Sequence, residues 1–257
     1  MLYQTKYIIL FGIIGGLLFT LPFYNWVFAK GWDFSEGFPL GWLGAGLTYF
    51  STFFHEIGHT IFLWFYGYFT IPMFDFQHGG GMAYHFGGQN PMILLGVYSL
   101  LGYGIYKFHK YPVILVPLVL ALILNVALVT NETLHMNLIN FMGPGFESLV
   151  AGFLIFRAVF DLAPRGVFER LLNSIFGFGM GFFALISAHA LLHNEAYRLV
   201  YFEQKGQHGF GDFDKIATQI SFMDFKTVVF TWMGLTLVCM ATPFVLYLVM
   251  PKSHELY

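Results

Sequence analysis

Long apolar stretches dominate this sequence and restrict what it can fold into. A single membrane crossing needs about 20 predominantly apolar residues in a helix. Seven stretches meet or approach that length, at residues 7–29, 38–68, 91–106, 112–130, 136–160, 171–193 and 226–250. Charged residues make up only 10% of the chain against 57% hydrophobic residues, too few for a surface in water. We therefore predict an all-α polytopic membrane protein with about seven transmembrane helices, forming a single integral membrane domain over residues 1–257.

The charge balance and the cysteine content exclude two other classes of protein. Lys and Arg number 12 against 14 Asp and Glu and form no basic patch, which excludes a nucleic-acid-binding protein. The one cysteine, Cys239, lies in an apolar run, which excludes a disulfide scaffold. The partners that remain are lipids and other membrane polypeptides. We expect the chain to reside in the bacterial inner membrane.

The basic residues predict an orientation in the bilayer. The first apolar stretch is longer than the h-region of a signal peptide, which has about 7–15 residues, so we expect it to span the membrane. With seven crossings, Lys6 and the long connection 194–225 lie on one side. The other side carries the basic residues of the short connections: Lys30, Lys107, Lys110, Arg157, Arg165 and Arg170. The positive-inside rule then predicts an N-terminus outside the cytoplasm.

The second apolar stretch contains a metal-binding pattern. His55 and His59 are four residues apart, so both imidazoles lie on one face of a helix, and Glu56 lies beside them. This is the His-Glu-x-x-His zinc motif, in which the glutamate acts on a metal-bound water. Ionisable groups within an apolar span cost about 3 kcal/mol each unless they face a cavity, a partner or a metal. We therefore expect a zinc ion here rather than hydrogen bonds between helices alone.

The residues after His55 extend the match. The sequence His-Glu-Ile-Gly-His is followed by Gly67 and, after a gap, by an apolar segment from Ile71 that ends at Gly79-Gly80-Gly81. This pattern resembles the site-2 protease family of intramembrane zinc metalloproteases. The family helix reads His-Glu-x-Gly-His with a glycine at this later spacing, and a short apolar β-hairpin follows it. The resemblance implies hydrolysis of membrane-embedded or membrane-anchored polypeptides, with Glu56 as general base. An interfacial loop with aromatic anchors is the alternative to the hairpin.

A catalytic zinc site needs a third protein ligand and one open position. In the family this ligand is an aspartate on a later helix, in a pattern of Asn, Pro and Leu-Asp-Gly. The nearest segment here is 137–148, which contains Asn140, Pro144 and Glu147 but no Leu-Asp-Gly. We predict Glu147 as the third ligand because a carboxylate in an apolar run needs a partner. The alternatives are Glu132, His135 and His78.

Two further polar features allow two interpretations each. Asn140 or Asn137 would bind substrate backbone or a developing oxyanion near the metal. Alternatively, each would only form hydrogen bonds with the helix end that Pro144 creates. His189 and His193 form a second pair at helical spacing, which suits a metal or haem but equally a helix end at the membrane surface.

The competing hypothesis for the whole chain is a protease-like scaffold without activity. It would serve as a structural subunit of a larger membrane complex, to which the aromatic content of 21% is well suited. The intact set of His55, Glu56 and His59 favours the enzyme, because without catalysis nothing offsets its cost in an apolar span.

Overall fold

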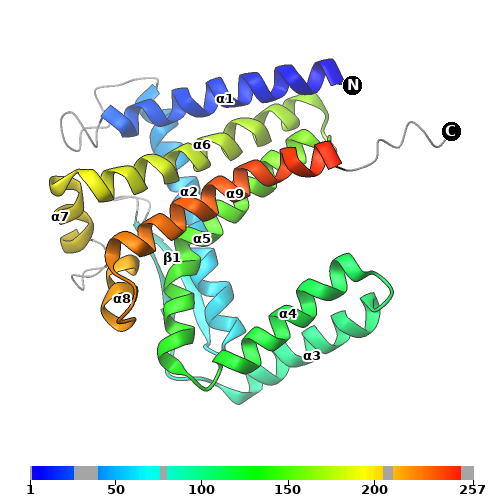
Figure 1. The fold of residues 1–257 in the computed structure, drawn as a ribbon, viewed down its shortest axis with the longest axis vertical. Helices are drawn as coiled ribbons and strands as arrows, with labels where there is room; N and C mark the ends of the chain where they lie inside the picture. Colours follow the sequence, from blue (N-terminus) through cyan, green and yellow to red (C-terminus); the bar gives the residue numbers. More distant parts are fainter. Residues whose placement is uncertain (1, 26–39, 76–79, 205–210, 250–257) are drawn as a thin grey trace.

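The computed structural model describes residues 2–25, 40–75, 80–204 and 211–249, most of them helical (Figure 1). The elements follow in the order α1 (Leu2–Asn25), α2 (Leu40–Phe65), β1 (Thr70–Asp75), β2 (Gly80–His85), α3 (Pro91–Phe108), α4 (Pro112–Leu128), α5 (Glu132–Val159), α6 (Val167–His193), α7 (Glu195–Gln204), α8 (Asp212–Gln219) and α9 (Phe225–Val249).

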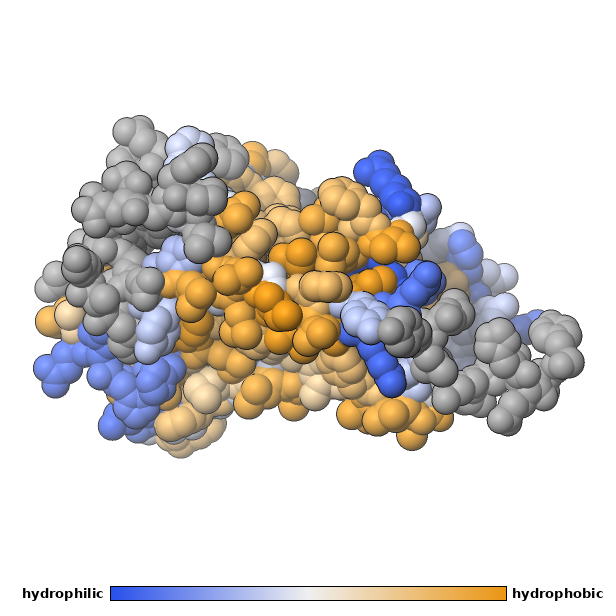
Figure 2. Space-filling view, turned by 90° about the horizontal axis from the view of Figure 1, so that it is seen from above, coloured by the Kyte–Doolittle hydropathy of each residue, from blue (hydrophilic) through white to orange (hydrophobic). Residues whose placement is uncertain are grey.

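Five of the described helices are long and apolar enough to cross a membrane: Gln4–Tyr24 within α1, then α3, α5, α6 and α9. In Figure 1, α1, α6, α9 and the second half of α5 run side by side. Glycines let α1 and α6 approach closely, since a Cβ on Gly16 would lie 2.7 Å from the backbone nitrogen of Gly179. These features suit a bundle whose outer surface faces lipid, and Figure 2 shows a broad apolar band between hydrophilic ends.

Two of the seven predicted crossings are not confirmed among the described residues. α4 is an apolar helix of only 17 residues. α2 has 26 residues, but His55, Glu56 and His59 interrupt its apolar sequence, and it runs across the direction of α1 and α6 in Figure 1. The parts of the first two predicted helices at residues 26–29 and 38–39 lie outside the described residues.

The direction of α2 corrects the predicted orientation. The Arg170 guanidinium, near the start of α6, donates to Thr5 Oγ1 over 2.7 Å. Lys6 therefore lies at the same end of the bundle as the α5–α6 connection, whereas the sequence placed it on the opposite side. The prediction was wrong because it counted α2 as one full crossing between these two positions.

The direction of α5 changes at Pro144, so its two halves pack against different helices. Pro144 lies inside the helix and leaves the Asn140 carbonyl without its usual backbone donor. The first half of α5 lies along α2, and the second half turns to run with α6 and α9 (Figure 1). The Pro144 carbonyl accepts a hydrogen bond from Trp232 Nε1 of α9 over 3.0 Å, which holds the turn in place.

The predicted β-hairpin after α2 is confirmed. β1 and β2 pair in antiparallel register from Thr70 opposite His85 to Asp75 opposite Gly80. Phe74 of β1 stacks on Phe53 of α2, with ring centroids 5.1 Å apart, so the hairpin lies along the helix that carries the histidine motif.

α3 and α4 form a helical hairpin that extends from the rest of the chain (Figure 1). No residue of α3 is buried, and in α4 only Asn125 is, where its amide donates to the Phe65 carbonyl. Large apolar side chains cover the outside of both helices, as expected for a surface in contact with acyl chains.

Candidate metal centre

Two imidazoles converge on one side of α2. His55 and His59 lie one helical turn apart with ring centroids separated by 4.7 Å. Their Nε2 atoms are 3.1 Å apart, and both residues are buried. Gly58 permits this burial because a Cβ there would lie 2.5 Å from Cβ of Phe146, so α2 and α5 approach closely at the motif. The predicted convergence of the two histidines is confirmed.

Asp212 completes the set of donors. Its Oδ2 lies 3.1 Å from His55 Nε2 and 3.5 Å from His59 Nε2. One ligand atom from each residue lies within 4.8 Å of the others, so these three side chains could hold a metal ion. Over the ranges that the structure describes, no other group of three His, Cys, Asp or Glu side chains does so.

Asp212 was not predicted from the sequence. It begins α8, whose apolar side chains Phe213 and Ile216 are buried against the bundle. The amphipathic spacing of 212–219 predicts a short helix lying on the core. Nothing in that spacing relates the helix to His55, 157 residues earlier in the chain.

α8 is held firmly, which fixes Asp212. Asp214 forms an ion pair with Arg198 of α7, and the Arg198 guanidinium lies 3.7 Å from the centroid of the Phe225 ring. Burial alone would raise the pKa of the Asp212 carboxyl. The two histidines outweigh burial through charge and hydrogen bonding, and the pKa lies well below its usual range.

Hydrogen bonds to Nδ1 orient both rings. Nδ1 of His59 lies 2.8 Å from the Ile139 carbonyl oxygen. A carbonyl oxygen only accepts hydrogen bonds, so Nδ1 carries a proton and donates it. Nδ1 of His55 lies 2.5 Å from Oε1 of Glu147, and the Ser51 hydroxyl donates to the other oxygen of that carboxylate. Both rings thus present Nε2 to the shared space, in the arrangement typical of histidines that bind metals.

Gly143 lets α5 pass close to the ring edges that carry both Nε2 atoms. A Cβ on Gly143 would lie 2.7 Å from Nε2 of His55 and closer still to Nε2 of His59, so a larger residue would displace both rings. Two imidazoles and one carboxylate form the donor set of a catalytic zinc site with an open position. The residues present therefore fit the metal.

The predicted third ligand lies elsewhere in the site than expected. Glu147 is buried and contacts His55, but through Nδ1, on the side of the ring away from Asp212. His135 is also buried and bonds to the Tyr68 hydroxyl over 2.9 Å, and the exposed Glu132 lines the same polar cavity of about 320 Å³ as His135. Neither joins the three donors. His78 lies outside the described residues.

Glu56 follows His55 directly in the sequence. Its side chain is buried, and β2 lies against it. A Cβ on Gly81 would lie 2.5 Å from Cγ of Glu56 and 3.1 Å from its Oε1. The glycine at this position thus lets the strand backbone approach the carboxylate closely.

The remaining predicted residues have simpler surroundings. Asn140 is buried on α5, one turn before Gly143, and Asn137 donates to the Thr133 carbonyl of its own helix over 2.8 Å. The His189 and His193 rings lie side by side at 4.6 Å on the exposed face of the last turns of α6.

Comparisons of the chain with family models, with curated proteins and with solved structures find no match. The resemblance to site-2 proteases therefore stays a prediction based on the motif.

Proposed function

We propose that this protein is an intramembrane zinc metalloprotease that hydrolyses peptide bonds of membrane-embedded or membrane-anchored polypeptides. The observation that carries the proposal is the convergence of ligand atoms from His55, His59 and Asp212 within 4.8 Å of one another, with Glu56 on the same helix as the two histidines. The helices of membrane length around it favour a substrate within the bilayer. We retain the bacterial inner membrane as part of the proposal.

Each residue of the centre has a separate task. His55, His59 and Asp212 would hold the zinc, and Glu147 would orient His55. Bound zinc would supply Lewis-acid polarisation of the scissile carbonyl and would acidify a water. Glu56 would accept the proton from that water and return it to the leaving amine. This assignment replaces Glu147 by Asp212 as the third ligand.

The β-hairpin suggests how a substrate would lie. β2 contacts Glu56 through Gly81, so a chain extended along the hairpin would have its carbonyl groups near this carboxylate. An extended chain exposes the carbonyls that a helix keeps in hydrogen bonds, and strand addition holds such a chain by backbone bonds alone. Asn140, buried one turn before Gly143, is our candidate to bind substrate backbone.

A scaffold without activity is the second candidate function. The observation that favours it is the α3–α4 hairpin, whose apolar surface would suit neighbouring subunits of a membrane complex. The donor set at the metal centre has no role in that hypothesis.

The two candidates separate in one experiment. Purified protein is reconstituted with a membrane-anchored reporter polypeptide, and cleavage and zinc content are measured together. We expect cleavage by the unmodified protein, no cleavage by Glu56→Gln and equal zinc in both. Glu132→Gln, which alters a carboxylate outside the donor set, should match the unmodified protein in both measurements. Cleavage that persists at full rate in Glu56→Gln would contradict the role of Glu56, and zinc without cleavage in the unmodified protein would favour the scaffold.

A further inference from the structure

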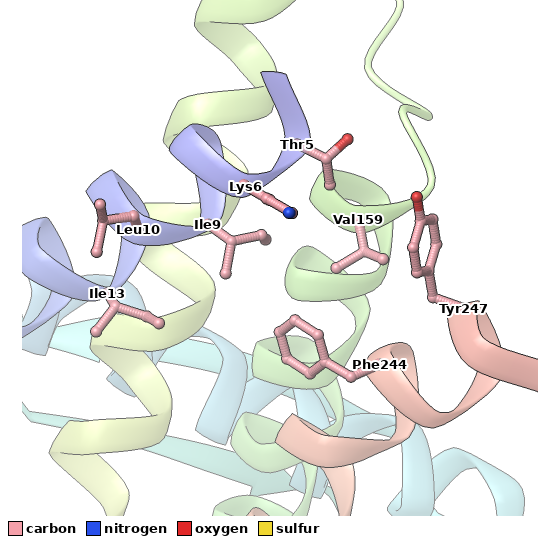
Figure 3. Close-up of a pocket in the computed structure, with 8 residues that line it drawn as sticks. All are labelled: Thr5, Lys6, Ile9, Leu10, Ile13, Val159, Phe244 and Tyr247. Carbon is pink, nitrogen blue, oxygen red and sulfur yellow. The ribbon is translucent and has the colours of Figure 1, made fainter. Parts of the chain in front are cut away.

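A cavity of about 340 Å³ lies between α1 and α9, with part of α5 between the two helices (Figure 3). It plays no part in the proposed zinc chemistry. The residues that line it are Thr5, Lys6, Ile9, Leu10, Ile13, Val159, Phe244 and Tyr247.

Polar and apolar groups are separated along this groove. In Figure 3 the hydroxyls of Thr5 and Tyr247 lie toward one end, and the Lys6 ammonium points into the groove near that end. The side chains of Ile13 and Phe244 form the other end and carry no polar atom. A ligand that fits must therefore have an apolar chain joined to a polar group at one terminus.

The surroundings identify the apolar part of such a ligand. α1 and α9 are both long and apolar enough to span a bilayer, so the groove opens on the hydrocarbon region. Contact with acyl chains is the ordinary state of such a surface, and a groove between two helices holds one chain in a fixed place. Tyrosine at a membrane interface commonly places its hydroxyl at the level of the lipid head groups, which suits Tyr247.

Charge identifies the head group. Two arginines at this end of the bundle already have partners, since Arg157 pairs with Glu169 and Arg170 with Asp161. Lys6 forms no ion pair with any residue that the structure describes, and its side chain is exposed. A phosphate at the mouth of the groove would neutralise Lys6 and accept hydrogen bonds from nearby hydroxyls.

The orientation of the bundle supports an anionic lipid. Lys6 lies at the same end as Arg157, Arg165 and Arg170, as the bond from Arg170 to Thr5 shows. The positive-inside rule assigns such a basic end to the cytoplasm. Basic pockets between transmembrane helices on that side bind anionic head groups.

We propose that the groove between α1 and α9 binds one anionic glycerophospholipid, with an acyl chain along Ile13 and Phe244 and the phosphate at Lys6. The lipid joins α1 to α9 across the groove, and it therefore stabilises the bundle. This proposal depends on membrane integration and not on zinc or proteolysis.

The test compares two lipids with identical acyl chains. Delipidated protein in detergent receives phosphatidylglycerol or phosphatidylcholine, and bound lipid is counted by native mass spectrometry while thermal unfolding is recorded. We expect one phosphatidylglycerol to be retained at least about tenfold more than phosphatidylcholine, which corresponds to about 1.4 kcal/mol. Only phosphatidylglycerol should raise the midpoint of unfolding, because a ligand stabilises the state that it binds.

Two variants and a control locate the lipid. Lys6→Gln should reduce retention of phosphatidylglycerol to that of phosphatidylcholine, and Lys107→Gln, an equally exposed lysine on α3, should leave it unchanged. Ile13→Trp should fill the groove and abolish retention of both lipids. Equal retention of the two lipids by the unmodified protein would overturn the proposal, as would Lys6→Gln with unchanged preference. Loss in Ile13→Trp without loss of preference in Lys6→Gln would also overturn the assignment of the head group.

Discussion

Replacing Gly143 by alanine tests the metal centre through a single methyl group. The new Cβ would lie 2.7 Å from Nε2 of His55, 2.6 Å from Cε1 of His59 and closer still to Nε2 of His59. A zinc ion needs the same nitrogen atoms at about 2.0–2.1 Å. The methyl group would collide with both imidazoles at the atoms that bind the ion, so the rings must move and the donor geometry is lost.

The expected magnitude follows from that overlap. Removing a group that merely supports a zinc ligand typically costs 10–100-fold in metal affinity. Gly143→Ala displaces two ligands themselves, so we expect a loss of at least about 100-fold, equivalent to about 2.8 kcal/mol. The effect on helix propensity is opposite in sign, because alanine stabilises a helix interior by about 1 kcal/mol relative to glycine. Loss of zinc would therefore not reflect a weaker helix.

The assay is zinc affinity by competition with a chromophoric chelator, together with thermal unfolding in the chelator alone. Gly145→Ala is the matched control on the same helix, since its Cβ would meet Phe141 and Met142 at ordinary contact distances of 3.4 and 3.5 Å. The control should bind zinc as the unmodified protein does. Zinc affinity in Gly143→Ala equal to that in Gly145→Ala would refute a metal between His55 and His59.

Three further predictions follow from the contacts of the centre. Glu147→Gln should weaken zinc binding about 10–100-fold without abolishing it, because the glutamate orients His55 rather than binding the ion; complete loss in a zinc titration would restore Glu147 as a ligand. Gly81→Ala should lower the rate of reporter cleavage and leave zinc affinity unchanged, since the atoms nearest to its Cβ would all belong to the Glu56 side chain; an unchanged rate would place β2 away from the reaction. Removing zinc with a chelator should lower the midpoint of thermal unfolding by mass action but leave the helical circular dichroism intact, because packing of Phe213 and Ile216 and the ion pair of Asp214 with Arg198 hold α8 in place; collapse of helicity would show that the centre holds the fold together.

The sequence predicted the parts of this molecule that depend on local spacing. Two histidines four residues apart must share a helix face. The hairpin was expected from the family resemblance, with an interfacial loop as the alternative, and the structure extends it past the glycines to His85. The proximity of Glu147 to the histidines also followed from the cost of a carboxylate in an apolar helix. These inferences need only the residues within one element or a strong energetic demand.

The rest depended on contacts that no spacing encodes. Glu147 contacts Nδ1 of His55 and not Nε2, which no sequence pattern shows. This contact makes Glu147 a residue that orients the histidine and not a ligand of the metal. Asp212 reaches the site through packing of α8 against the core, at Phe213 and Ile216. α2 has a length typical of a membrane crossing, but its direction is set by the helices around it.

The most direct test of the metal centre is the zinc content of purified protein prepared without chelators. We expect close to one zinc per chain in the unmodified protein and in Asp224→Asn, an exposed position where asparagine can still cap α9. Asp212→Asn should retain less than about a tenth of an equivalent, because zinc sites with only two protein ligands are not tight. Zinc below about a tenth of an equivalent in the unmodified protein, or equal zinc in Asp212→Asn and Asp224→Asn, would contradict a zinc centre formed by His55, His59 and Asp212.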